Sequence, residues 1–192
     1  MRYEVKMLQS KLKITVLFVT HDQLEALSLS TRLAVMDHGR VQQVGTPREL
    51  YEHPVNDFVR DFLGKAIVFK GTASAIGRNS ATLELNGGSG EITINPNPFT
   101  EETSPGRAVI ASLRPEDIDI VSMKHLNAGA PSLLAVVEAA AFVGERMEYR
   151  ISVQGQSGVV IFGSRRNSFQ EGETVRLLLP SGDSGLWMVR PG

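Results

Sequence analysis

The chain has 192 residues, with 20 Lys plus Arg against 21 Asp plus Glu, and it contains no cysteine. The near-neutral charge argues against a nucleic-acid-binding protein, because such proteins usually carry a basic excess. Without cysteine the chain can form neither a disulfide framework nor a thiolate metal site. No apolar run reaches the roughly 18 residues that span a bilayer, and the N-terminus lacks the pattern of a signal peptide. We therefore expect a soluble chain whose membrane role, if any, depends on a partner.

The first part of the sequence, up to Gly64, has a mixed and mainly helical pattern. Four apolar residues recur there at helical spacing: Met1, Val5, Leu8 and Leu12. They predict an amphipathic helix over residues 1–12. The β-branched run from Ile14 to Val19 predicts a strand that is buried on both faces of a parallel sheet. A second helix is expected from about Gln23 to Ser30.

Further short elements follow in chain order. Residues 33–36 and 41–44 are expected to be strands, joined by a turn at residues 37–40 in which Gly39 has a positive φ. Thr46, Pro47 and Glu49 form a capping-box pattern that predicts the start of a helix.

A last short helix is expected over residues 57–63, with Gly64 as its C-terminal cap. The order of helices and strands predicts an α/β architecture. However, so few short strands cannot form a doubly wound sheet on their own.

The most specific string in the sequence is Val19-Thr20-His21-Asp22-Gln23-Leu24-Glu25-Ala26-Leu27. It resembles the switch motif, or H-loop, of ABC-transporter ATPases. The resemblance continues in order through the segments 33–39, 41–47, 50–54 and 58–64. It implies that residues 1–64 are the C-terminal part of an ABC ATPase domain, an α/β remnant of the P-loop fold.

His21 is the candidate catalytic residue. At the C-terminal end of a buried parallel strand it would lie where α/β sheets bind ligands, and an imidazole there can donate a hydrogen bond to a phosphate oxygen. The family resemblance implies that His21 contacts the γ-phosphate of ATP and helps to position the attacking water. The alternative is a histidine that is satisfied by the local backbone.

The rest of the ATPase apparatus is missing from these 192 residues. A phosphate-binding loop needs G-x-x-x-x-G-K-[ST], but Gly64-Lys65 is followed by Ala66. Asp37 ends a Walker B-like run, yet a histidine follows it, so we interpret it as a turn residue. The glycine-rich segment 86–90 is interpreted as a hairpin loop and not as an ABC signature. We therefore expect a fragment that neither binds nor hydrolyses ATP by itself and that holds no metal.

Residues 65–192 have a different sequence pattern, in which short Val/Ile/Leu runs alternate with Gly, Ser, Asn and Pro. This pattern is typical of an all-β barrel or sandwich. The predicted strands are 67–72, 80–85, 90–94, 108–113, 118–121, 133–143, 147–153, 157–161, 174–179 and 186–189.

The segment Ala111-Ser112-Leu113-Arg114-Pro115-Glu116-Asp117-Ile118 resembles a hallmark of the transport-associated OB (TOBE) domain, which follows the ATPase domain in this class of importer. The later Phe142-Val143-Gly144 and Trp187 fit the same resemblance. Pro115 should force Arg114 into extended geometry and end the strand. Glu116 and Asp117 lie close enough in sequence to pair with Arg114. A structural corner and a regulatory contact across a dimer both remain open.

Two ligand classes can be weighed for this OB-like domain, residues 65–192. Nucleic-acid binding would need exposed aromatic residues in a basic groove. The domain has few aromatic residues, and its basic pair Arg165-Arg166 is expected in a solvated loop. Nucleic acid is therefore not an expected partner, whereas sensing of a small molecule or an oxyanion stays open.

Together the resemblances imply the C-terminal portion of the ATP-hydrolysing, energy-coupling subunit of a bacterial ABC solute importer of the polyamine, ferric iron or phosphonate type. They imply ATP and Mg²⁺ as cofactors of the intact protein. They also imply a second copy, transmembrane permease subunits and, indirectly, a solute-binding protein as partners, at the cytoplasmic face of the membrane.

Two alternatives remain beside this reading. One is a stand-alone regulatory or dimerisation TOBE module without catalysis. The other is an unrelated enzyme that uses His21, His38, His53 or His125, although the spacing of these four residues does not suit a metal site. The apolar faces of residues 1–12 and 14–19 would be exposed in this chain, which predicts dimerisation or domain exchange.

Overall fold

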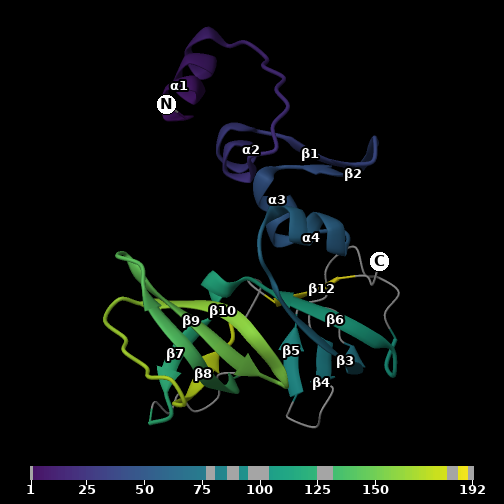
Figure 1. Ribbon diagram of the computed structural model, residues 1–192. Helices are drawn as coiled ribbons and strands as arrows, with labels where there is room; N and C mark the ends of the chain where they lie inside the picture. The colour runs from purple at the N-terminus through teal and green to yellow at the C-terminus, as the bar shows by residue number, and fades with distance from the viewer. Residues whose placement is uncertain are drawn as a thin grey trace. The chain divides into compact units, whose positions relative to one another are not determined.

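The computed structural model describes residues 2–76, 81–85, 91–94, 104–124, 132–180 and 186–189. The chain divides into two compact units, Met1–Gly64 and Lys65–Pro191. Figure 1 shows the helices in the first unit and a β-rich second unit. Among the described helices, none combines the length and the apolar character that crossing a bilayer requires.

The first unit contains, in the part that the structure describes, short helices and one antiparallel β-hairpin. Their bounds are α1 Arg2–Leu12, α2 Gln23–Leu29, β1 Leu33–Asp37, β2 Arg40–Gly45, α3 Pro47–Glu52 and α4 Asp57–Leu63. The predicted turn between the two strands is confirmed. His38 and Gly39 both have positive φ, at 44° and 76°, which is the geometry of a tight two-residue hairpin turn. Asp37 is the last residue of β1 and pairs with Arg40 of β2, so the turn itself is His38–Gly39 and is shorter than the predicted 37–40.

The helices α3 and α4 begin at capping residues. The Thr46 hydroxyl accepts the backbone N–H of Glu49 at 3.3 Å, and the Glu49 carboxylate accepts the backbone N–H of Thr46 at 2.8 Å. The predicted capping box is thus confirmed. Asn56 caps α4 with a single hydrogen bond, in which its side-chain oxygen accepts the Val59 N–H at 3.0 Å, and Gly64 follows that helix as its C-terminal cap. The two helices and β1 bury a small apolar core, formed by Val35, Leu50, Val59 and Leu63.

The expected buried strand at Ile14–Val19 is wrong. Residues 14–20 lie outside helices and strands, and Leu17 and Val19 are 94% and 97% exposed. A strand needs a neighbour for its backbone N–H and C=O groups, and no described segment pairs with this one. The only sheet described in this unit is the antiparallel β1–β2 hairpin. The parallel α/β arrangement is therefore not found in the described part of these 64 residues.

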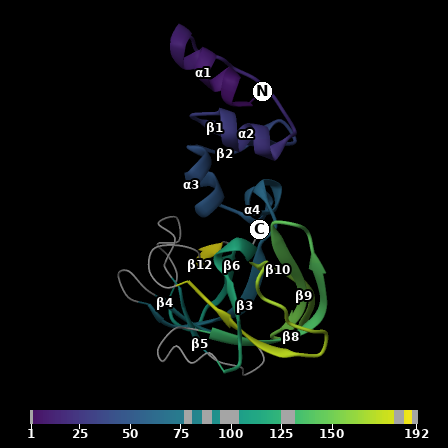
Figure 2. The same ribbon diagram turned by 90° about the vertical axis from the view of Figure 1, so that its left-hand side faces the viewer.

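The second unit is an all-β structure of two five-stranded antiparallel sheets, ordered β12-β6-β3-β4-β5 and β10-β9-β8-β11-β7. Figures 1 and 2 show both sheets. The strand bounds are β3 Ile67–Ile76, β4 Ala81–Leu85, β5 Glu91–Ile94, β6 Ala108–Leu113, β7 Asp119–Ser122, β8 Ser132–Phe142, β9 Arg146–Val153, β10 Gln156–Ser164, β11 Thr174–Leu178 and β12 Leu186–Val189. The predicted all-β class of this region is confirmed, because each predicted strand overlaps one of these.

The two sheets share one apolar core. Phe69 and Leu113 from the first sheet and Tyr149, Ile151 and Leu177 from the second are buried in the same cluster. The second sheet also curls, so that its two edge strands β7 and β10 approach each other. The Asn167 side chain donates a hydrogen bond from Nδ2 to the Ile120 carbonyl across this gap, at 3.2 Å. We call the line where β7 and β10 meet the seam.

Candidate functional site

His21 lies in a turn between the extended segment and α2, and its side chain is exposed. The residues on both sides of it are fixed by hydrogen bonds. The Thr20 hydroxyl accepts the Asp22 backbone N–H at 3.0 Å and donates to the Glu25 carboxylate at 2.9 Å. The Asp22 carboxylate in turn caps α2 by accepting the Glu25 N–H at 3.0 Å. This Thr20–Asp22–Glu25 clamp holds the backbone that carries the imidazole.

The other candidate histidines are not gathered around His21. His38 lies in the β1–β2 turn and is exposed, His53 caps the end of α3, and His125 lies outside the described residues. Within the described ranges, no group of three or more His, Cys, Asp or Glu side chains could hold a metal ion. His21 is thus an exposed histidine on a fixed backbone, and the described part of the chain gathers no metal-binding cluster around it.

Arg114 is the centre of the predicted corner in the second unit. Its backbone is extended, at φ −78° and ψ 141°, and it follows the end of β6. Pro115 opens the short 3-10 turn η1, Pro115–Asp117, so the predicted effect of the proline is confirmed. The Arg114 side chain is only 1% exposed and donates from Nη1 to the Lys65 carbonyl at 3.2 Å. It thus ties the corner to Lys65, two residues before β3, which agrees with a structural role for this motif.

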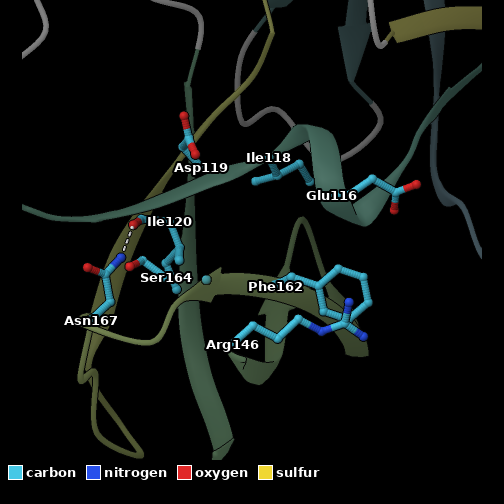
Figure 3. A pocket seen from close by; sticks show the side chains of 9 residues that line it. Glu116, Ile118, Asp119, Ile120, Arg146, Phe162, Ser164 and Asn167 are labelled. Atoms are coloured by element: carbon cyan, nitrogen blue, oxygen red, sulfur yellow. Dashed lines mark hydrogen bonds between the residues drawn. The ribbon is translucent and has the colours of Figure 1, made fainter. Parts of the chain in front are cut away.

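A pocket of about 330 Å³ opens at the seam. Its walls come from η1, β7, β9, β10 and the loop that follows β10. The lining residues are Glu116, Ile118, Asp119, Ile120, Arg146, Phe162, Gly163, Ser164 and Asn167. Figure 3 shows Arg146 and Phe162 stacked on one side of the pocket, with Asn167 and Ser164 on the other. The pocket therefore offers one carboxylate-bearing rim, one cation and several neutral polar groups.

The cation of this pocket is held in place by its neighbours. The Arg146 guanidinium lies 3.7 Å from the centroid of the Phe162 ring, a cation–π contact. Its Nη2 also donates to the Glu148 carboxylate at 3.1 Å. The lining of the pocket also includes two carboxylates, Glu116 and Asp119, which oppose the positive charge of Arg146. The pocket therefore lacks the basic character that a strong anion site needs.

The loop after β10 is anchored by a buried tyrosine. The Tyr149 hydroxyl donates to the Asn167 carbonyl at 3.0 Å and accepts the Phe169 backbone N–H at 3.5 Å. Burial raises the pKa of this hydroxyl. Gly163 lies against the ring: a Cβ there would come within 2.7 Å of Tyr149 Cε2 and 3.0 Å of Ile120 Cγ2. A glycine is thus needed for β10 to pass this close to the tyrosine.

Sequence reasoning found some of these features and missed others. It located His21, the Arg114 corner and the Arg165-Arg166 pair, which is exposed as expected. The expected pairing of Arg114 with Glu116 and Asp117 stays a prediction. The clamp around His21 was missed, although Asp22 followed three residues later by Glu25 is a helix-start pattern. The seam pocket was missed because its residues are distant in sequence and carry no local signal.

Two comparisons with known proteins concern the second unit. The model of the TOBE domain family matches residues 111–185. A crystal structure of the cytoplasmic molybdate-binding protein ModG, with molybdate bound, superposes with a TM-score of 0.52, 16% sequence identity, and coverage of 62% of this chain and 94% of that one. At this identity the likeness shows the fold alone. Residues 111–185 therefore belong to a TOBE domain, and the second unit that contains them has an OB-like fold.

Sequence relatives match a longer part of the chain than the TOBE family model does. The spermidine/putrescine import ATP-binding protein PotA of Rubrobacter xylanophilus is 40% identical over 149 residues, which are 78% of this chain and 38% of that protein. PotA of Lawsonia intracellularis is 38% identical over 184 residues, 91% of this chain and 48% of that protein. PotA of Escherichia coli K12 is 36% identical over 162 residues, 84% of this chain and 41% of that protein.

This chain is thus a homologue of the ATP-binding subunits of ABC importers. More particularly, the relatives named above are subunits for spermidine and putrescine import. The chain spans between about two fifths and one half of the length of these relatives.

Proposed function

We propose that the chain is the C-terminal portion of the energy-coupling ATP-binding subunit of a polyamine importer. The observation that carries the proposal is the 38% identity to PotA of Lawsonia intracellularis over 184 residues. Because this match covers 91% of the chain, it must extend through most of both units. It therefore links the histidine segment and the TOBE domain to the same class of protein.

In the complete subunit, His21 donates a hydrogen bond to the γ-phosphate of ATP and helps to orient the attacking water. Charge develops on the phosphoryl oxygens during transfer, so a donor fixed beforehand stabilises the transition state. The Thr20–Asp22–Glu25 clamp supports this role, because it fixes the backbone on both sides of the imidazole.

The residues of this chain do not fit an ATP site by themselves. His21 is exposed, and no G-x-x-x-x-G-K-[ST] loop occurs among the 192 residues. The phosphates and Mg²⁺ would be held by segments beyond those 192 residues. We therefore expect no ATP turnover from the chain alone.

The partners follow from the same proposal. The complete subunit works as a pair with a second copy, on the inner face of the membrane, against permease subunits that receive polyamine from a solute-binding protein. Exposed apolar side chains in the first unit support a need for partners: Leu8, Leu12, Ile14, Leu17, Phe18 and Val19. Monomeric proteins rarely expose large apolar side chains in contiguous groups, whereas protein–protein interfaces often contain them.

A chimeric subunit tests the proposal. The region of Escherichia coli PotA that precedes its match to this chain would be joined to residues 1–192 and expressed in cells that lack PotA. Restored spermidine uptake is the expected result. His21→Ala should lower the ATP turnover of the purified chimera by about 100-fold or more, the usual cost of losing one transition-state donor. His38→Ala, which removes an exposed histidine from the β1–β2 turn, is the matched control and should leave turnover unchanged.

The result that contradicts the proposal is equally specific. A chimera that folds and binds ATP, yet turns it over equally well before and after the change His21→Ala, would remove His21 from the chemistry. A well-folded chimera that never supports uptake would remove the chain from this class of importer.

A second candidate function is a regulatory or dimerisation module without catalysis. The second unit, which has an apolar core of its own, favours it. On this view the isolated chain forms a dimer, shows no heat of binding with ATP in calorimetry, and cannot replace the end of PotA in the chimera. Uptake by the chimera would rule this candidate out.

A further inference from the structure

The seam pocket combines opposite charges with apolar side chains. Its lining contains the carboxylates of Glu116 and Asp119 and the guanidinium of Arg146, together with Ile118, Ile120 and Phe162. Figure 3 shows Asp119 and Arg146 on opposite sides of the view, with Ile118 and Phe162 between them. The volume of about 330 Å³ is at the lower end of the range for small-molecule sites, roughly 300–1,000 Å³. A small ligand that crosses the pocket therefore meets a negative side, an apolar middle and a positive side.

The positive side has a donor to offer. Among the described residues, the only hydrogen bond of the Arg146 guanidinium runs from Nη2 to Glu148, at 3.1 Å, so Nη1 is left without an acceptor. The side chain is 42% exposed, and its contact with the Phe162 ring, 3.7 Å from the centroid, holds the group in place. A guanidinium held in this way can form a charge-assisted hydrogen bond with a carboxylate in the pocket.

The negative side is equally available. Asp119 is the first residue of β7, and its backbone is fixed by pairing with Leu178 of β11. The residue is exposed, and no group in the described ranges forms an ion pair or a hydrogen bond with its carboxylate. Glu116 adds a second negative charge to the lining. An ammonium group can therefore pair with Asp119 without displacing another partner.

This arrangement disfavours a ligand with charge of one sign. A diamine that brings one ammonium group to Asp119 directs the other towards the Arg146 guanidinium, where like charges repel. A simple anion is attracted by Arg146 but repelled by the two carboxylates. A zwitterion with separated charges places each end beside the opposite charge, and its methylene groups cover apolar surface. Electrostatic complementarity of this kind selects between ligands of similar size.

We propose that the seam pocket binds a small zwitterion in which a short aliphatic chain separates an amino group from a carboxylate. The carboxylate accepts a hydrogen bond from Arg146, the amino group donates to Asp119, and the methylene groups lie against Ile118 and Phe162. This site goes beyond the proposed function, because it belongs to the second unit and does not depend on His21. Its test uses neither ATP nor the chimera, so the two can fail separately.

A matched series of ligands tests the proposal by NMR titration of the isotope-labelled 192-residue chain. At neutral pH δ-aminovalerate carries both charges, pentylamine only the ammonium, valerate only the carboxylate, and cadaverine an ammonium group at each end. We expect δ-aminovalerate to shift the amide signals of residues 118–120 and 162–164. It should bind at least about tenfold more tightly than the other three, since each of them loses one charge-assisted hydrogen bond. No binding of δ-aminovalerate, or equal binding of any of the other three, would overturn the proposal.

Two variants assign the ends of the ligand. Asp119→Asn and Arg146→Gln should each weaken the binding of δ-aminovalerate by about tenfold or more. Glu171→Gln removes an exposed carboxylate that does not line the pocket, and it should leave the affinity unchanged. Arg146→Gln also removes the contact with Phe162, whereas Asp119→Asn keeps the size of an exposed side chain and so preserves the fold. Wild-type affinity in Asp119→Asn would overturn the proposal.

Discussion

Replacing Tyr149 by phenylalanine tests how the TOBE domain holds the loop at its seam. The change removes a hydroxyl that donates to the Asn167 carbonyl at 3.0 Å and accepts the Phe169 N–H at 3.5 Å. The ring itself stays, so its contact with Phe169, at 5.6 Å between centroids, is retained. Any loss of stability therefore reports on the hydroxyl and on the two backbone groups that it leaves without their partner.

The expected cost follows from those two groups. A hydrogen bond whose loss leaves a buried polar group unsatisfied costs about 1–3 kcal/mol. For a unit of this size, about 2 kcal/mol corresponds to a drop of roughly 6–10 °C in the unfolding midpoint. Urea unfolding followed by the fluorescence of Trp187, the only tryptophan, measures the change in free energy. Tyr51→Phe alters the other unit and should leave this transition in place.

The pKa of Tyr149 gives the same variant a second readout. Because burial raises the pKa of the folded-state hydroxyl, the unfolded chain loses this proton first as the pH increases. The contribution of this hydroxyl to the free energy of unfolding should therefore be fully present below the ordinary tyrosine pKa of about 10 and should be lost as the pH rises above it. Tyr149→Phe should remove that alkaline loss. An unchanged unfolding free energy at neutral pH, together with an unchanged alkaline loss, would refute the account of the loop anchor.

Three further predictions concern other contacts. Gly163→Ala should destabilise the second unit by about 1–3 kcal/mol in urea unfolding, because the new Cβ would meet the Tyr149 ring at 2.7 Å; a wild-type midpoint would show that the ring can move aside. Glu138 has a lowered pKa, caused first by the Ser157 side-chain hydrogen bond, so its contribution to stability is present above the ordinary glutamate pKa and lost as the pH falls through the folded-state value. Glu138→Gln should flatten this acid loss in unfolding curves between about pH 3 and 7, whereas an identical pH dependence would contradict the assignment. Thr20→Val should break the clamp on His21 and lower ATP turnover of the chimera by roughly tenfold to a hundredfold, with little change in ATP binding; a wild-type rate would mean that the clamp does not position the histidine.

The second unit could be predicted from the sequence strand by strand. Its strands alternate with turns of Gly, Asn, Ser and Pro, and the alternation marks both the strand ends and the buried face. The first unit was harder. The run Ile14–Val19 has the composition of a buried strand, but composition cannot supply the neighbouring strands whose backbone groups it needs. In these 192 residues the run stays unpaired among the described segments.

The site was predictable only where its signal is local. His21 and the Arg114 corner are each carried by a short string, and the capping box at Thr46 is carried by four residues. The seam pocket joins Glu116 to Phe162 and Asn167, residues that only the curl of the sheet brings together.

The measurement that tests the central claim most directly is the ATP turnover of the purified chimera beside that of the isolated chain. We predict turnover by the chimera that depends on His21 and none by the chain alone. Turnover by the isolated chain, or a folded, ATP-binding chimera that is indifferent to His21→Ala, would contradict the assignment of this chain to the end of an importer ATPase.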